Sequence, residues 1–236
     1  MPPMTDRPRD QLRPISLELG FTQATPGSVL ISMGRTRVLC TASIDEKVPR
    51  WMQGSGRGWV TAEYAMLPGS SSERVPRDHI SGGRAKEISR LIGRALRSAV
   101  DLEALGEMMV RVDCDVIEAD GGTRTASITG GWVALHQALQ DAVTRGVVEA
   151  NPIRDEVAAV SVGLVEGEVV LDLDYELDVA ADVDMNVVMN GRGLLVDVQG
   201  TAEGKPFSRA QFDQLLDLAA KGMAELFDLQ RRAVAD

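Results

Sequence analysis

Alternating apolar and polar residues predict three strands in each half of the chain. In the first half, SVLISMGRTRVLCTASI (28–44) alternates on both sides of a Gly-Arg turn, and WVTAEYAML (59–67) adds a third strand. In the second half, VAAVSVGLVEGEVVLDLDYELD (157–178) predicts two strands about a Glu-Gly turn, and LLVDVQGTA (194–202) predicts a third. Because the order of elements repeats while the residues do not, we interpret the chain as an internal duplication.

Apolar residues at helical spacing predict a helix in AKEISRLIGRALRSAV (85–100). Its apolar face comprises Ile88, Leu91, Ile92, Ala95, Leu96 and Ala99. Arg90, Arg94 and Arg97 lie three or four residues apart on another face. A solvated surface is the simplest interpretation of this arginine stripe. Like charges at this spacing nevertheless destabilise a helix, and that cost favours a bound anion.

Two more helices complete the predicted elements. From Thr125 to near Gly146, apolar residues again recur at helical spacing. Ser208 and Gln211 fit a capping box before a terminal helix. Strands outnumber helices and no Pro- or Ser-rich linker separates the halves, so we predict a single α+β domain over residues 12–236, with halves of about 12–150 and 151–236. Residues 1–11 lack the apolar segment of a signal peptide, and we expect a flexible N-terminal tail.

The apolar runs and the two cysteines indicate in which compartment the protein is expected. The longest apolar run, near 157–165, is too short to span a bilayer, so we expect no membrane partner. Cys40 and Cys114 lie in strand-like runs, where small core residues are their simplest interpretation. Two buried thiols in a chain of 236 residues also favour a reducing compartment, and we expect a cytoplasmic protein.

Charge is divided unevenly along the chain. The overall net charge of −10 by itself argues against a nucleic-acid partner. Residues 1–97, however, carry 15 Lys and Arg against 9 Asp and Glu, whereas residues 98–236 carry 10 against 26. Most of the cations are arginines, whose planar fork matches two phosphate oxygens; a GC-rich genome explains that ratio but not the segregation. We therefore expect one surface for phosphates and another for metal ions or a basic partner.

The stretch EADGGTRTASITGG (118–131) is the first candidate for chemistry. Alternation in VRVDCDVIEAD (110–120) predicts a further strand, and the stretch leads from its end into the helix near Thr125. Glycines permit a sharp bend and a close backbone approach, and free N–H groups in the first turn of a helix bind anions. Thr123 adds a hydroxyl and Arg124 a forked cation, which together suit a phosphate. A plain turn with Thr123 or Thr125 as N-cap explains the motif equally well, and the missing lysine excludes a Walker loop.

The second candidate is DLDYELDVAADVDMN (172–186). Its acidic residues are Asp172, Asp174, Glu176, Asp178, Asp182 and Asp184. Acidic and apolar residues alternate at first, so a strand here would carry carboxylates along one face. A solvated face is the usual interpretation, but stacked like charges repel unless a cation lies among them. Carboxylates without nearby His or Cys suit Mg²⁺ or Mn²⁺ rather than zinc, and neither His79 nor His136 has the neighbours of a Ser-His-Asp triad.

The third candidate is SGGRAKEI (81–88), which again places two glycines and an arginine, Arg84, at the start of a helix. Two anion sites and one acidic site match the needs of phosphoryl transfer. Its transition state spreads negative charge over oxygens, and donors, arginines and a metal ion stabilise that charge.

Several of these segments together resemble the ribonuclease PH family, from about Leu12 to Leu229. The segments are VLCTASI, GWVTAEYAMLP, GGR followed by EISRLIGRALR, DCDVIEADGGTRTASITG, ADVDMNVVM and VQGTAEGKPF. The resemblance implies a phosphorolytic 3′-exoribonuclease that trims precursor tRNA and other RNA 3′ ends and releases nucleoside diphosphates. It also implies a homohexamer built as a trimer of dimers, and a duplicated β/α core with left-handed crossovers.

Site residues also follow from the resemblance. The implied phosphate site consists of Arg84, Gly122, Thr123 and Arg124. The implied metal-proximal residues, also expected to be catalytic together with the two arginines, are Asp178 and Asp184. Inorganic phosphate is the implied co-substrate, and Mg²⁺, or else Mn²⁺, is the expected ion.

The loop over residues 68–83 departs from the family pattern. Family members tend to be longer and more basic there, with Arg where this chain has Gly69. The arginines expected to contact RNA phosphates are Arg57, Arg74, Arg77, Arg90, Arg94 and Arg97. An inert RNA-binding ring subunit and a plain nucleotide-binding protein are the alternative hypotheses. The full set of site residues disfavours the first, and the missing P-loop lysine disfavours the second.

Overall fold

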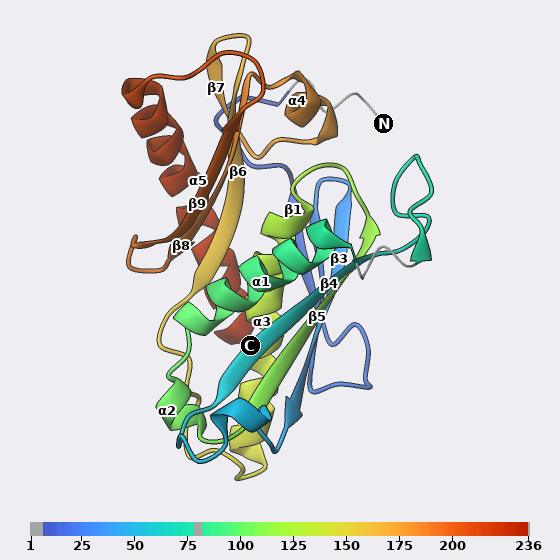
Figure 1. The fold of residues 1–236 in the computed structure, drawn as a ribbon, viewed down its shortest axis with the longest axis vertical. Helices are drawn as coiled ribbons and strands as arrows, with labels where there is room; N and C mark the ends of the chain where they lie inside the picture. Colours follow the sequence, from blue (N-terminus) through green and yellow to red (C-terminus); the bar gives the residue numbers. More distant parts are fainter. Residues whose placement is uncertain (1–6, 78–81, 236) are drawn as a thin grey trace.

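The computed structural model describes residues 7–77 and 82–235, shown as a ribbon in Figure 1. The elements in chain order are β1 (Ile15–Leu19), β2 (Gly27–Met33), β3 (Thr36–Asp45), η2 (Arg50–Met52), β4 (Trp59–Met66), α1 (Gly83–Ser98), α2 (Leu102–Leu105), β5 (Met109–Glu118), α3 (Thr123–Thr144), β6 (Val157–Val165), β7 (Glu168–Leu171), α4 (Tyr175–Ala180), β8 (Val183–Asn190), β9 (Leu195–Ala202) and α5 (Arg209–Ala235). This mixture confirms the predicted α+β class.

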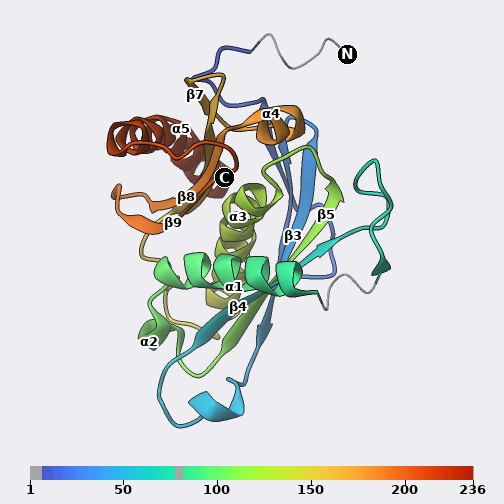
Figure 2. The same cartoon turned by 45° about the horizontal axis from the view of Figure 1, so that its top comes forward.

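The first sheet has the strand order β1-β2-β3-β5-β4. Its neighbours are antiparallel except β4 and β5, which run parallel and are connected through α1 and α2. In β5, Val110 and Val112 are fully buried while Asp113 and Asp115 point to the opposite face. Helices α1 and α3 pack on the buried face, and Figure 2 shows both lying against the strands. The period-two pattern of the sequence therefore identifies the core side of this sheet.

The second sheet is antiparallel, with the order β7-β6-β8-β9. Every residue of β6 is buried because α3 and α5 both pack against this strand. Strand β8 was not among the strands expected from alternation. The buried residues of β8 belong to the same hydrophobic cluster as the buried face of the first sheet. One continuous core therefore connects the two sheets.

The two strands predicted over 157–178 are observed as β6 and β7, but the second is wrong beyond Leu171, where β7 ends. Asp172 adopts a left-handed backbone conformation with φ 55°, which interrupts the extended chain. Asp174 then caps α4, because its Oδ1 accepts a hydrogen bond from the Leu177 N–H at 3.0 Å. The acidic residues therefore occupy a bend, a short helix and the start of β8, and they do not form one strand face.

Helix α3 begins two residues earlier than predicted and is buried on most of its sides. It lies between the first sheet and β6 and also contacts α1 and α5, so it has no single apolar face. The capping box before α5 is confirmed. The Ser208 N–H donates to Gln211 Oε1 at 2.8 Å, and the Gln211 N–H donates to Ser208 Oγ at 3.2 Å.

Residues 7–11 differ from the expected flexible tail, of which residues 1–6 lie outside the described part. The Arg9 carbonyl accepts a hydrogen bond from Leu171 N at 2.7 Å, and Arg7 Nη2 donates to the Asp172 carbonyl at 2.8 Å. These contacts attach the segment to the end of β7. Cys40 and Cys114 are buried, free and opposite each other on β3 and β5, as expected of core residues. Within the described ranges, no helix has the length and hydropathy needed to cross a membrane.

Candidate active site

The loop before α3 has the geometry of an anion-binding helix N-terminus. Gly121 and Gly122 adopt φ values of 74° and 66°, which favour glycine. Gly122 is the N-cap residue, and no described side chain caps the helix. Thr125 Oγ1 instead donates to the Gly122 carbonyl at 2.8 Å. The alternative in which Thr123 or Thr125 is the N-cap is therefore wrong, and the first-turn N–H groups are left for another acceptor.

Tyr64 of β4 contacts this loop and was not predicted as a site residue. Its hydroxyl lies 2.8 Å from Thr123 Oγ1. Burial raises the pKa of Tyr64, while the hydrogen bond from Thr123 and the charges of Arg84 and Arg124 act in the opposite direction. Arg84 and Arg124 therefore both lie near this hydroxyl.

Arg124 connects three elements at this point. Its Nη1 lies 3.7 Å from Glu87 Oε1 on α1 and 3.4 Å from Gln199 Oε1 on β9. Arg84 is exposed in the first turn of α1, whose N-cap Gly82 makes no side-chain cap. The N-termini of α1 and α3 thus bring two arginines to one place, where helix dipoles also favour an anion.

Asp178 on α4 and Asp184 at the start of β8 lie beside these arginines. The pKa of Asp178 is raised, first by desolvation and then by the charge of Asp184, while Arg124 and Arg84 lower it. Glu203, which follows β9, also raises this pKa. The four residues expected to be catalytic are therefore close enough to interact, although they come from α1, α3, α4 and β8.

The two aspartates fit the donor set for Mg²⁺. Mg²⁺ is usually bound through one or two carboxylates, while water and substrate phosphates complete its coordination. In the described ranges, no group of three or more His, Cys, Asp or Glu side chains is placed to hold a metal ion. A cation between Asp178 and Asp184 would also relieve their mutual repulsion. The pair therefore suits an ion that is shared with a phosphate substrate.

The predicted RNA-binding arginines are distributed over the surface. Arg57, Arg74, Arg77 and Arg90 are exposed. Arg94 is exposed and pairs with Asp197 of β9 at 2.8 Å.

Arg97 has an internal role that differs from the predicted RNA contact. Its guanidinium lies 4.1 Å from the centre of the Trp59 ring, and its Nη1 donates to the Val60 carbonyl at 2.7 Å. These contacts attach the end of α1 to β4. Of the arginine stripe, Arg90 and Arg94 are therefore exposed, whereas Arg97 packs against β4.

A surface hollow lies next to the phosphate loop, not on it. It has a volume of about 710 Å³ and is lined by residues that include Arg35, Ser70, Asp120 and Tyr175. None of the four residues expected to be catalytic lines it. A small anion and the end of a long polymer do not need a deep pocket. The cluster of charged residues is therefore a better guide to the site than the depth of the surface.

Sequence reasoning missed Tyr64, Gln199 and Glu203 for a common reason. All three lie in the segments GWVTAEYAMLP and VQGTAEGKPF, which contributed to the family resemblance. Neither segment has glycines beside an arginine or a run of acids. Only the pairing of strands brings them to the ends of α1 and α3.

Comparisons with known proteins show the family of this chain. The model of the 3′ exoribonuclease family, domain 1, matches residues 11–139, and that of domain 2 matches residues 155–222. Ribonuclease PH of Methylorubrum populi is 55% identical over 232 residues, covering 97% of this chain and 98% of the relative. Ribonuclease PH of Brucella ovis is 54% identical over 233 residues, with the same two coverages.

Solved structures share the fold at low sequence identity. The rice (Oryza sativa) Rrp46 structure has a TM-score of 0.81 at 18% identity and covers 98% of this chain and 99% of that chain. A structure of the Archaeoglobus fulgidus exosome with RNA bound to the active site has a TM-score of 0.80 at 22% identity, covering 95% and 91%. Together with the two family models and the bacterial relatives, these findings show that the chain belongs to the 3′ exoribonuclease family.

Proposed function

We propose that this protein is a phosphorolytic 3′-to-5′ exoribonuclease that uses inorganic phosphate to trim the 3′ ends of precursor tRNA and releases nucleoside diphosphates. The observation that best supports this function is that Arg84 and Arg124, each in the first turn of a helix, both lie near Asp178, which is in turn near Asp184. Two cations and a row of N–H donors suit a small anion, and the adjacent acids suit a cation that bridges phosphates.

In the proposed reaction, Arg84, Thr123, Arg124 and the Gly122 N-cap hold the attacking phosphate. One of its oxygens bonds to the phosphorus of the last phosphodiester, and the bond from that phosphorus to O3′ of the preceding nucleotide breaks. O3′ takes up a proton, and the last nucleotide leaves as a 5′-diphosphate. No side-chain base is needed because phosphate is already an anionic nucleophile. Arginines and helix N–H groups stabilise the charge on the equatorial oxygens.

Asp178 and Asp184 would hold Mg²⁺, or Mn²⁺, through their carboxylates. When bound, this ion supplies positive charge to the bridging and leaving oxygens. The aspartates must be ionised to do so. Desolvation and the charge of Asp184 raise the pKa of Asp178, and the positive charges of Arg124 and Arg84 partly offset this rise.

An inert RNA-binding subunit is the alternative from another class of function. Such a subunit has no use for two arginines, a helix N-terminus and a pair of aspartates in one place. The decisive experiment is to incubate the protein with a 5′-labelled RNA in the presence and absence of phosphate and to separate the released nucleotides. Phosphate-dependent release of diphosphates is expected. Monophosphates formed without added phosphate would show hydrolysis instead.

For the RNA chain itself, we propose contacts with Arg57, Arg74, Arg77, Arg90 and Arg94. Arg57 precedes β4, whereas Arg74 and Arg77 follow it, so the two groups are separated by the length of an eight-residue strand, roughly 26 Å. That span suits a folded RNA substrate better than a short one. We also propose assembly into a homohexamer, as a trimer of dimers, and a cytoplasmic location, where precursor tRNA is found.

A further inference from the structure

Arg13 lies far along the sequence from the residues predicted to bind phosphate or metal. Its side chain forms a buried ion pair with Asp172. Arg13 precedes β1, and its side chain and that of Asp172 are both 0% exposed. Asp172 Oδ2 accepts from Arg13 N and Nε, each at 2.9 Å, and Oδ1 accepts from Nη2 at 2.7 Å. Removing two charges from water is unfavourable unless their hydrogen bonds are well satisfied. Stability alone therefore does not explain why this ion pair is buried.

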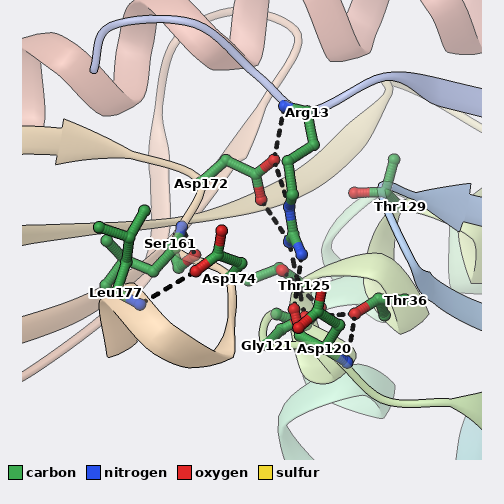
Figure 3. A network of polar contacts seen from close by, with 12 residues as sticks. Arg13, Thr36, Asp120, Gly121, Thr125, Thr129, Ser161, Asp172, Asp174 and Leu177 are labelled. Atoms are coloured by element: carbon green, nitrogen blue, oxygen red, sulfur yellow. Dashed lines mark hydrogen bonds and ion pairs between the residues drawn. The ribbon is translucent and has the colours of Figure 1, made fainter. Parts of the chain in front are cut away.

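The rest of the Arg13 guanidinium reaches the phosphate loop. Nη1 donates to the Asp120 carbonyl at 2.6 Å, and Nη2 approaches the Gly121 carbonyl at 3.5 Å. Figure 3 shows Arg13 between Asp172 on one side and Asp120 and Gly121 on the other. A Cβ atom at Gly122 would lie 2.9 Å from Arg13 Nη2, so the loop and the guanidinium are in close contact.

The partner Asp172 belongs to the segment that leads to the acidic half of the site. Two residues later Asp174 caps α4, the helix that carries Asp178. The phosphate loop also packs directly on this segment, since a Cβ atom at Gly121 would lie 2.6 Å from the Leu173 carbonyl oxygen. Arg13 is thus bonded both to the loop before Thr123 and Arg124 and to the segment before Asp178.

Thr36, at the start of β3, is a second support for the same loop. Its Oγ1 donates to the Gly121 carbonyl at 2.6 Å and accepts from the Asp120 N–H at 2.9 Å. Arg35 adds two hydrogen bonds to the Asp120 carboxylate, at 3.0 and 2.9 Å. These bonds hold the loop to the first sheet, whereas the Arg13 bonds hold it to the second half of the chain.

We propose that Arg13 is a positioning residue for the phosphorolytic reaction. Its guanidinium, held by Asp172, fixes the phosphate loop relative to Asp178 and thereby sets the affinity for the attacking phosphate without touching it. This inference rests on the phosphate site proposed above. If Arg13 had a purely structural role, replacing it would lower the stability of the fold and leave the affinity for phosphate unchanged.

The first test replaces the planar fork by a point charge. In Arg13→Lys the ion pair with Asp172 is retained, but one ammonium group cannot supply donors to Asp172, Asp120 and Gly121 in fixed directions. Since a misplacement of about 1 Å can cost roughly 10²-fold in rate, we expect the KM for phosphate to rise roughly tenfold or more. The KM for a short RNA should change by less than about twofold.

A matched control removes buried hydrogen bonds elsewhere. Gln230 of α5 is fully buried, and its Nε2 donates to the carbonyls of Thr129 and Val157 at 3.0 and 2.9 Å. Gln230→Leu should lower the melting temperature without raising the KM for phosphate. If Arg13→Lys behaves like this control, with lower stability and a normal KM for phosphate, the positioning role is wrong.

A second variant covers the case in which Arg13→Lys does not fold. Arg13→Gln combined with Asp172→Asn removes both charges of the Arg13–Asp172 pair, and Asn tolerates the left-handed conformation at position 172. Arg7, whose Nη1 lies 3.9 Å from Asp172 Oδ2, loses this carboxylate but keeps its hydrogen bond to the carbonyl of residue 172. The shorter Gln should not reach Asp120, so a raised KM for phosphate is again expected. A folded double variant with the wild-type KM for phosphate would overturn the inference. If the wild type itself needs no phosphate, the proposed function fails first, which separates the two failures.

Discussion

Replacing Arg124 by alanine gives a direct test of the phosphate site. Arg124 contacts Glu87 at 3.7 Å and Gln199 at 3.4 Å, and its side chain retains 20% of its exposure. Because the Glu87 side chain is 43% exposed and the charged atoms lie 3.7 Å apart, this ion pair contributes only about 0.2–1 kcal/mol to folding. Loss of one preorganised donor to the reacting phosphate, by contrast, costs about 10²–10³-fold in rate, or roughly 3–4 kcal/mol in the barrier. The variant should therefore fold normally and lose nearly all phosphorolysis.

A change in pH dependence should accompany this loss. Arg124 lowers the pKa of Asp178, so its removal raises that pKa further above the ordinary value for Asp. The proposed role of Asp178 requires the ionised form, which exists above its pKa. Residual activity of Arg124→Ala should therefore decline at a higher pH than wild-type activity as the solution is acidified. An acidic limb at the wild-type position would mean that Asp178 does not titrate in the active state.

The assay compares rate and RNA affinity for each variant. Phosphorolysis is measured on a short labelled RNA, and RNA affinity is measured by filter binding without phosphate. Arg192→Ala is the control, because Arg192 pairs with Asp155 at 2.6 Å in the turn after β8, at the far end of that strand from Asp184. Equal losses of rate and RNA affinity in Arg124→Ala would refute the assignment of this residue to the attacking phosphate.

Three further predictions follow from the same description. Tyr64→Phe removes the hydroxyl that lies 2.8 Å from Thr123, and the KM for phosphate measured in steady-state kinetics should rise several-fold; an unchanged value would exclude a role for Tyr64. Replacing Arg74 and Arg77 together should lower the salt slope of tRNA binding by roughly one to two units and raise the KM for tRNA but not for a short RNA, whereas an unchanged slope would indicate a solvated loop. Light scattering should give a hexamer, and a mass near 25.4 kDa would contradict it.

The sequence was informative wherever one local segment determines the geometry. Gly122 needs a left-handed conformation at the start of α3, and Ser208 and Gln211 bond to each other within one turn. Both features follow from side-chain chemistry over a few residues. The GGTR and GGR motifs were therefore placed at helix N-termini from the sequence alone.

The acidic segment could not be placed from its local pattern. Acidic and apolar side chains alternate over residues 172–179, which fits a strand, yet the structure has a short helix, α4, that begins after its cap, Asp174. The turn at Asp172 depends on Arg13, whose position in the sequence gives no sign of it. Arg97 is a similar case, because spacing on a helix does not reveal that Trp59 lies beneath it.

The separation between Arg13 and its partners affects how the protein is made. Asp120 is 107 residues away and Asp172 is 159 residues away. At about 5–20 residues per second, Arg13 is synthesised roughly 8–32 s before Asp172. A nascent chain that already contains the whole phosphate loop therefore still lacks the carboxylate that holds Arg13 in place. Closing so long a loop comes late in folding, so the newborn protein should acquire activity only after its second sheet has formed.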